Sequence, residues 1–227
     1  AIFLHGDSGR NIKNGDAFED EKTVKISKAI YGKGAKDMTE LGKGIYKKFG
    51  KAKDGFDIIS NQFSIHYFFK NEETLRKFVE NVADNCKLNG HFIGTCYDGR
   101  KIFKMLENKK YGESHSLKHD GNVQWEVQKL YNEETFENNE KSIGYKINVF
   151  QESINKKIPE YLVNFDYFIS VMNNYGFVPA PIESLNKFKL MKSIGSFNNL
   201  FDKMNEDIKS RRLSKNFIGK AQSMSRN

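Results

Sequence analysis

The chain has 227 residues, of which 38% are hydrophobic and 29% charged, and its mean hydropathy is −0.67. It is long enough to bury one sizeable core, and no run approaches the roughly 18 consecutive apolar residues of a membrane-spanning helix. The net charge of +8 favours a polyanionic partner such as nucleic acid, although a solvated lysine-rich surface explains it equally well. Ala1–Leu4 is too short for a signal peptide, and Cys86 and Cys96 lack the companion histidines of a metal site. We therefore expect an intracellular, reducing compartment, no metal and no membrane segment.

The first half of the chain alternates helical and strand-like patterns. The clearest helix starts at Asn71, has acids at positions 72 and 73, and carries an apolar stripe of Leu75, Phe78, Val79, Val82 and Cys86. In chain order we expect a strand end at 2–4, a Gly/Asn-rich loop at 6–15, one or two short helices at 21–50 (the second near 37–49), a buried strand at 56–60, the helix from Asn71, a turn at 89–90 into a strand at 91–96, and a helix at 100–107. Strands separated by helices in this way favour a parallel sheet.

After Lys110 the pattern changes to strands joined by polar segments. We expect strands at 123–130, 144–150 and 161–163, a helix at 165–175 that ends at Gly176, a last strand at 177–178, and an amphipathic helix at 197–208. From Glu183 to Asn227 there are ten Lys or Arg against four Asp or Glu. The sequence thus predicts an α/β fold whose parallel half is followed by a mixed antiparallel half, with one domain at 1–183 and a helical, basic tail at 184–227.

The strand at 56–60 runs into an aromatic cluster that holds a glutamine and a histidine. Gln62, His66 and Tyr67 follow the strand, with phenylalanines at positions 63, 68 and 69. The carboxyl ends of parallel strands are where open α/β sheets bind ligands. An aromatic face stacks on a base for roughly 1–3 kcal/mol, and an imidazole can donate to a guanine carbonyl. A core histidine among core aromatics is the alternative, and the position beyond the strand end favours a ligand site.

Two acidic positions fit the edges of a purine. Asp7 and Ser8 follow the first expected strand, where a carboxylate can accept from an exocyclic amine and the next N–H can donate to a ring nitrogen; an ordinary Asx turn is the alternative. Glu160 suits the N1–H and N2 amine of guanine through a charge-assisted bidentate contact, and a solvated acid at a strand entry is the alternative. No Ser/His/Asp or Cys/His arrangement and no phosphate-loop motif stands out.

Four segments in a fixed order form a combined signature. They are His5-Gly6-Asp7-Ser8 with Asn11-Ile12, the run Phe56 to Phe69 with its Gln-Phe-Ser-x-His-Tyr, Asn89-Gly90-His91-Phe92-Ile93-Gly94-Thr95, and Glu160-Tyr161-Leu162-Val163 with Phe165. Together they closely resemble the messenger-RNA cap (guanine-N7) methyltransferases over about residues 1–180. The resemblance implies a class I, Rossmann-like methyltransferase fold and methyl transfer from S-adenosylmethionine to N7 of the cap guanine. Asp98-Gly99, where cellular members tend to have proline, is more similar to the versions in large DNA viruses.

The resemblance also implies positions for both substrates. The residues expected at S-adenosylmethionine are Asp7, Ser8, Gln62 and Phe63. The residues expected at the cap guanine are His66, Tyr67, Tyr97 and Glu160. None of them would touch the methyl group, so they would act by positioning alone. This agrees with the missing acid/base pair, because a ring nitrogen that needs no deprotonation can accept a methyl group through orientation.

The family's glycine-rich loop and ribose-binding acid have no counterpart in the sequence and would precede Ala1. We therefore expect an N-terminally incomplete methyltransferase domain that binds the donor poorly and is inactive alone. The expected partners are the capped 5′ end of RNA and other capping-enzyme domains, namely a triphosphatase and a guanylyltransferase. The expected location is a viral factory, virion or cytoplasm for a viral protein and the nucleus for a cellular one. Two alternatives remain: another methyltransferase of this fold with a small-molecule or protein acceptor, and a non-catalytic RNA-binding or stimulatory module.

Overall fold

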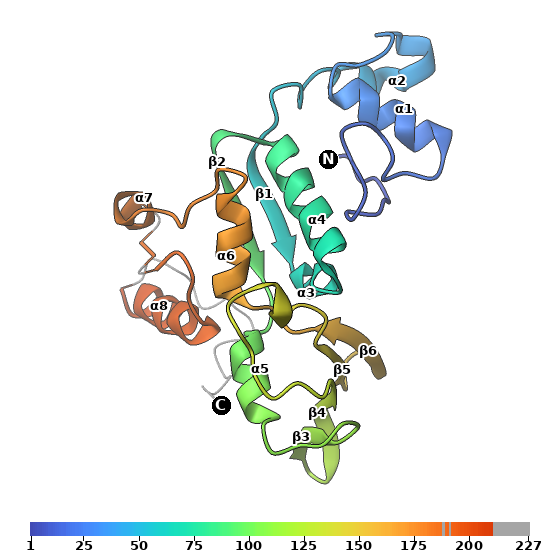
Figure 1. The fold of residues 1–227 in the computed structure, drawn as a ribbon. Coiled ribbons are helices and arrows are strands. Elements are labelled where there is room, and N and C mark those ends of the chain that lie inside the picture. Colours follow the sequence, from blue (N-terminus) through green and yellow to red (C-terminus); the bar gives the residue numbers. More distant parts are fainter. Residues whose placement is uncertain (188, 191, 211–227) are drawn as a thin grey trace. The chain divides into compact units, whose positions relative to one another are not determined.

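The computed structural model describes residues 1–187, 189–190 and 192–210, and the chain forms two units, Ala1–Phe177 and Val178–Asn227 (Figure 1). The second unit contains α7 (Ile182–Lys187) and α8 (Phe197–Lys209), and α8 confirms the helix expected at 197–208. The part of the expected basic tail from residue 211 onward lies outside the described residues, and the boundary expected at 183/184 stays a prediction. No helix among the described residues has both the length and the apolar character needed to span a bilayer.

The first unit begins with a loop and two short helices. The loop at 6–15 is confirmed, and it leads into α1 (Glu21–Ile30) and α2 (Met38–Tyr46), which confirm the helices expected before residue 50. Asp20 caps α1 by accepting from the backbone N–H of Thr23, and Asp37 caps α2 in the same way. The strand end expected at 2–4 is wrong: these residues form no strand, and Phe3 is 92% exposed.

Two parallel strands form the next layer. β1 (Phe56–Gln62) pairs with β2 (Cys86–Thr95), and α3 (Ile65–Phe68) and α4 (Glu72–Asn85) connect them. This βαβ unit confirms the predicted parallel pairing. Asn89 and Gly90 do not turn the chain before the strand. They lie inside β2, where the register shifts and Asn89 adopts a positive φ of 62°.

The sheet buries one face and exposes the other. α4 begins at the Asn71 cap as expected, and its stripe from Leu75 to Val82 is buried, whereas Cys86 already belongs to β2. The description of 56–60 as a buried strand is wrong, because Ile58 is 59% exposed while Ile59 packs on the core. A two-stranded sheet with helices on one side leaves alternate side chains in solvent.

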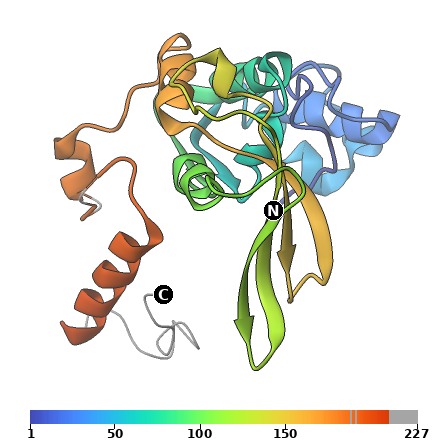
Figure 2. The ribbon, with the colours of Figure 1, turned by 60° about the horizontal axis from the view of Figure 1, so that its bottom comes forward.

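The second sheet is antiparallel and has the order β3 (Ser114–His119), β4 (Asn122–Leu130), β5 (Lys146–Gln151), β6 (Lys156–Tyr161). Figure 2 shows its two hairpins, β3–β4 in green and β5–β6 in yellow to orange, extending from the rest of the unit. The strands expected at 123–130 and 144–150 are confirmed. The strand expected at 161–163 is displaced toward the N-terminus and ends at Tyr161, and β3 was not expected.

Three further elements surround these sheets. α5 (Gly99–Met105) packs Ile102 against the antiparallel sheet, a short 3₁₀ helix spans Glu140–Ser142, and α6 (Phe165–Asn173) packs on α4. α5 and α6 confirm the helices expected at 100–107 and 165–175. The last strand expected at 177–178 is wrong: this segment is irregular and Val178 is 74% exposed.

Candidate ligand-binding site

The segment that follows β2 lies against the segment that follows β6. The backbone N–H of Gly99 donates to the carbonyl of Val163 at 3.1 Å. A Cβ at position 99 would lie 2.4 Å from that carbonyl oxygen, so only glycine allows this approach. The close contact places Cys96 to Gly99, at the carboxyl end of the parallel sheet, beside the end of the strand that carries Glu160.

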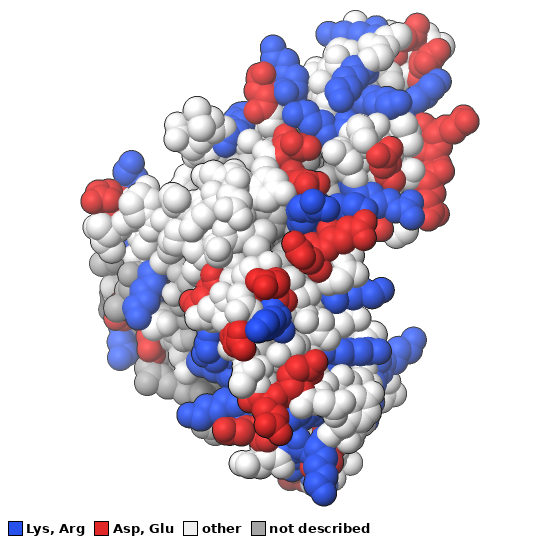
Figure 3. Space-filling model, viewed as in Figure 1, with Lys and Arg blue, Asp and Glu red and all other residues white. Residues whose placement is uncertain are grey.

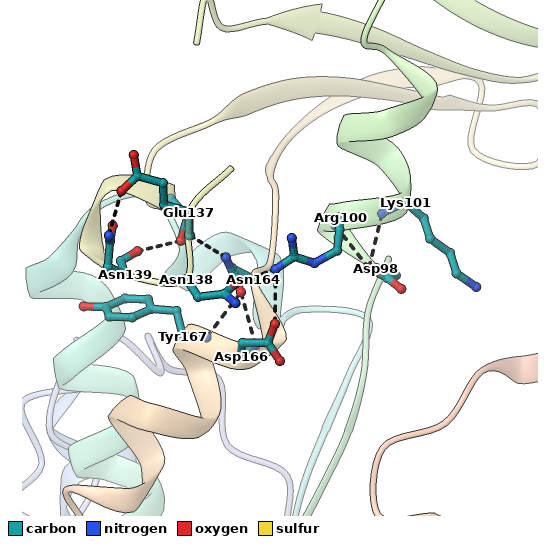
Figure 4. A network of polar contacts seen from close by, with 10 residues as sticks. Asp98, Arg100, Lys101, Glu137, Asn138, Asn139, Asn164, Asp166 and Tyr167 are labelled. Atoms are coloured by element: carbon teal, nitrogen blue, oxygen red, sulfur yellow. Dashed lines mark hydrogen bonds and ion pairs between the residues drawn. The ribbon is translucent and has the colours of Figure 1, made fainter. Parts of the chain in front are cut away.

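A polar network holds the segment after β6 (Figure 4). The buried side chain of Asn164 caps α6 and donates to the carbonyl of Glu137 at 2.7 Å. Arg100 reaches from α5 to Asp166 at 3.1 Å and also binds Asn138. Because these contacts tie α5, α6 and the 137–139 loop together, the chain on both sides of the strand end is fixed.

A histidine and a glutamate from distant parts of the sequence meet at this place. Nδ1 of His66, in α3, lies 3.6 Å from Oε2 of Glu160, in β6, which is beyond hydrogen-bond distance. Their side chains are only 6% and 9% exposed. Among the described residues, neither ring nitrogen of His66 nor Oε2 of Glu160 has a hydrogen-bond partner. Buried polar atoms are nearly always hydrogen-bonded in folded proteins, so three unpaired atoms at one point indicate a place for a polar ligand.

Burial changes the protonation of both groups. It lowers the pKa of His66 to about 4, so the imidazole is neutral at pH 7. It raises the pKa of Glu160 to about 7, so this carboxyl group is divided between its two forms near neutrality. A neutral imidazole offers one N–H donor and one nitrogen acceptor, and a carboxylate offers only acceptors.

Tyr67 adds an aromatic face to the pair. Its ring meets the ring of His66 edge to face, with centroids 4.3 Å apart, and the residue is 43% exposed. Burial and then the charge of Glu160 raise the pKa of the Tyr67 phenol. The phenol ring therefore lies at the solvent side of the same site, where a planar ring can stack on it.

The expected donor-side residues Gln62 and Phe63 are the last residue of β1 and the residue after it. The backbone N–H of Phe63 donates to the carbonyl and to Oγ1 of Thr95, at 2.9 and 3.1 Å. Oγ1 of Thr95 in turn donates to Oε1 of Gln62 at 2.8 Å. Phe63 has a positive φ of 52° and is 60% exposed. Thr95 thus fixes a turn that presents both side chains at the carboxyl end of the sheet.

Tyr97 is held by two residues that the sequence did not single out. Its hydroxyl oxygen accepts hydrogen bonds from Nε1 of Trp125 at 3.1 Å and from Nε2 of Gln151 at 2.8 Å. Trp125 and Gln151 are direct partners across β4 and β5. The only tryptophan of the chain was a signal for this cluster. Since the oxygen already accepts twice, the hydroxyl hydrogen remains to donate elsewhere.

The loop that carries Asp7 and Ser8 is held by contacts with α4. Oδ1 of Asp7 accepts from the N–H of Gly9 at 2.8 Å, which is the local turn considered as the alternative for this residue. Asn81 of α4 donates to the carbonyl groups of Ser8 at 2.8 Å and Arg10 at 2.5 Å. The role of Asp7 and Ser8 at an adenine stays a prediction.

The arrangement suits recognition of a planar heteroaromatic ring. Glu160 can accept two hydrogen bonds from adjacent N–H groups, neutral His66 can donate to a carbonyl, and Tyr67 can stack on the ring face. The site provides binding and orientation, and it contains no nucleophile paired with a base among the described residues. Chemistry at such a site depends on how the reactants are aligned.

Comparisons with known proteins agree with the resemblance seen in the sequence. Residues 27–223 match a family model described as the mRNA (guanine-N(7))-methyltransferase domain, so Asp7 and Ser8 lie before the matched region. The chain is 33% identical over 142 residues, or 58% of its length, to an mRNA cap guanine-N(7) methyltransferase of Saccharomyces cerevisiae. It is 32% identical over 123 residues, or 53% of its length, to one of Aspergillus niger. The identity to one of Candida glabrata is 28% over 160 residues, or 67% of the chain.

The matched part is a limited share of each relative. It makes up 30% of the Saccharomyces protein, 19% of the Aspergillus niger protein and 36% of the Candida protein. All three relatives are fungal, so the similarity to versions in large DNA viruses stays a prediction.

Proposed function

Because the chain belongs to the family of mRNA (guanine-N7)-methyltransferase domains, we propose that it transfers a methyl group from S-adenosylmethionine to N7 of the guanine that caps an RNA. One observation carries the proposal: Nδ1 of His66 and Oε2 of Glu160 lie buried 3.6 Å apart, without hydrogen-bond partners among the described residues, beside the exposed ring of Tyr67. These are the three side chains expected at the cap guanine.

Each of the three side chains has a distinct task toward guanine. The carboxylate of Glu160 accepts hydrogen bonds from N1–H and the N2 amine, and neutral His66 donates to the O6 carbonyl. Tyr67 stacks on the base for roughly 1–3 kcal/mol. Tyr97, held by Trp125, would line the same mouth. Guanine would satisfy Oε2 of Glu160 and one ring nitrogen of His66, which have no hydrogen-bond partner among the described residues, and this match supports guanine as the ligand.

The methyl step needs no base from the protein. N7 of guanine carries a lone pair that attacks the methyl carbon, while the bond from that carbon to the donor sulfur breaks and its electrons stay on sulfur. The positive charge moves from sulfur to the purine and no proton is transferred. Gln62 and Phe63, with Asp7 and Ser8, would hold the donor, and alignment of the two substrates would supply much of the rate.

The proposal extends to partners and location. The capped 5′ end of an RNA is the substrate, and the triphosphatase and guanylyltransferase that build the cap are the expected partner activities. A viral protein would act in the cytoplasm, viral factory or virion, and a cellular one in the nucleus.

The test uses the intact protein that carries these residues. His66→Ala and Glu160→Ala should each cripple methyl transfer to GpppG while donor binding, measured by calorimetry, is retained. The matched controls are His119→Ala and Glu107→Ala, since both residues are exposed. Unchanged activity in both site variants would end the assignment of these residues to the cap pocket. Transfer to a small molecule or protein without transfer to GpppG would favour the other methyltransferase activity.

A further inference from the structure

A run of 13 residues between Glu40 and Asp54 contains five lysines and no acid. We call this run, residues 41–53, the lysine segment; its lysines are Lys43, Lys47, Lys48, Lys51 and Lys53. All five are exposed, and in the part of the chain that the structure describes none forms an ion pair. Some lysines elsewhere are paired with acids, as Lys77 is with Glu73 at 2.6 Å.

The lysine segment has a fixed backbone. The end of α2 continues into tight turns, in which the N–H of Lys51 donates to the carbonyl of Lys48 at 3.1 Å. Two backbone bonds join the segment to the end of α1, from Gly50 to Ala29 at 2.8 Å and from Ala52 to Ile30 at 2.9 Å. Ala52 is fully buried, so the segment is anchored and its charged side chains project from a defined surface.

Two of the lysines are neighbours at the end of α2. Lys43 and Lys47, the last helical turn and the C-cap, are spaced by four residues, which places their side chains next to one another, and Lys48, Lys51 and Lys53 follow in the turns. Lys36 adds a further charge, with Nζ 5.1 Å from the centre of the Tyr46 ring. Figure 3 shows several blue side chains together over α1, α2 and the segment leading to β1, with acidic ones along the right-hand margin.

Like charges at this spacing repel one another, and no acid in the lysine segment offsets them. A chain of phosphates relieves the repulsion, and it releases its own condensed counterions when lysines replace them. Five positive charges within residues 43–53 fit a polymer with repeated negative groups better than a single small anion.

The lysine segment and the candidate cap site lie at opposite ends of β1. Phe56 begins β1 shortly after Lys53, and Gln62 ends it next to α3, which carries His66. A strand of seven residues spans about 20 Å, so the two places lie at opposite ends of β1. A cap with a few attached nucleotides can bridge this distance, and a dinucleotide cap analogue cannot.

We propose that the lysine segment binds the phosphate backbone of the capped RNA, a few nucleotides downstream of the cap guanine. The proposal rests on the proposed function for the identity of the bound end, and on the charges of residues 43–53 for the contact itself. Contacts of lysines with phosphates carry no base information, so the binding is independent of RNA sequence.

The first test measures RNA affinity without any enzymatic activity. An uncapped, fluorescent RNA of about 20 nucleotides is titrated with the chain and with its Lys43→Gln/Lys47→Gln/Lys51→Gln variant. The variant should bind at least about tenfold more weakly at moderate salt, and the slope of log affinity against log salt should fall by about 2, or roughly 0.7 per lost phosphate contact. The control is Lys101→Gln/Lys104→Gln/Lys110→Gln, which removes three equally exposed lysines elsewhere.

The second test measures methyl transfer by the intact protein. The triple variant of the lysine segment should raise KM for capped RNA of about 20 nucleotides by a factor similar to its loss of affinity, and leave KM for GpppG unchanged. Equal RNA affinity of variant and wild type, or an equal loss in the control, would overturn the proposal. A wild-type protein that binds RNA through these lysines but does not methylate GpppG would contradict the proposed function and leave the lysine contact standing.

Discussion

Replacement of Glu160 by glutamine should stabilise the protein without ligand and at the same time abolish recognition of the cap guanine. Oε2 of Glu160 has no hydrogen-bond partner among the described residues, and burial raises the pKa of this carboxyl to about 7. Glutamine has nearly the same shape and never ionises. The variant therefore avoids burial of an unpaired charge, and it loses the charge that pairs with guanine.

The sign and size of the effect follow from the two pKa values of Glu160. The folded protein binds this proton more tightly than the unfolded chain, because the pKa is about 7 in the fold against an ordinary 4.5. The resulting stability is complete below pH 4.5 and is lost as the pH rises through 7. The full difference corresponds to about 3 kcal/mol, most of which disappears between about pH 5 and about pH 8.

The other titratable groups at the site do not share this range. Burial lowers the pKa of His66 to about 4 and raises that of Cys96 to about 12, and burial with the charge of Glu160 raises that of Tyr67. All three are neutral in the folded protein between about pH 5 and about pH 8. The titration of His66 in the unfolded chain is common to wild type and Glu160→Gln, so the difference in stability between the two proteins reports Glu160.

The assay is thermal or urea unfolding of wild type and Glu160→Gln at both ends of this pH range. The variant should be more stable than wild type at the higher pH, by an amount that corresponds to roughly 6–12 °C in Tm, and the difference should nearly vanish at the lower pH. Glu107→Gln, an exposed carboxyl on the same unit, controls for charge alone. A difference that does not depend on pH would refute the reasoning.

Three further predictions concern the same region. Methyl transfer at subsaturating capped RNA should rise with pH around pH 7 as Glu160 ionises, and Glu160→Gln should flatten this limb of the pH–rate profile. Tyr97→Phe and Trp125→Phe should both raise KM for GpppG without changing donor affinity, because each removes the hydrogen bond between the two side chains. A further rise in KM when Trp125→Phe is added to Tyr97→Phe would show that Trp125 acts through something other than this hydrogen bond. Gly99→Ala should destabilise the fold by about 1–3 kcal/mol in urea unfolding, because its Cβ would lie 2.4 Å from the carbonyl oxygen of Val163.

Local signals in the sequence predicted the helices well. Asn71 is an N-cap where the sequence predicted a helix start, Asp98 caps the helix expected from residue 100, and Gly176 follows the end of α6 with a positive φ of 83°. A cap and an apolar stripe are encoded within a few neighbouring residues, so the sequence alone is enough to identify them.

Strands were predicted less well because a strand depends on a partner far away in the chain. Residues 2–4 and 177–178 have strand-like composition but pair with nothing among the described residues. β3 contains polar Ser and His residues and was missed, yet it pairs with β4 from Ser114 to His119. The exposure of Ile58 likewise depends on which elements cover the sheet, and composition carries no information about this.

The candidate site likewise has a part that the sequence predicted and a part that it missed. Nothing in the spacing of His66 and Glu160 places them together, and the ordered family signature supplied that expectation. The structure brings the two side chains to 3.6 Å. The support of Tyr97 by Trp125 and Gln151 was missed, because it requires the register of β4 against β5. Backbone pairing therefore determines the parts of the site that motifs do not contain.

Under the proposed function, the unpaired polar atoms of His66 and Glu160 account for how one small site would choose guanine. Within the described part of the chain, both ring nitrogens of His66 and Oε2 of Glu160 lack partners, which lowers stability. Guanine supplies N1–H and N2 donors to the carboxylate and a carbonyl to the imidazole. Adenine presents an acceptor at N1 and an amine at position 6, so it would leave the Glu160 carboxylate buried and unpaired. A site that must satisfy buried polar groups rejects the wrong base by more than a purely apolar pocket can. The instability of the empty site and its selectivity thus have the same physical origin.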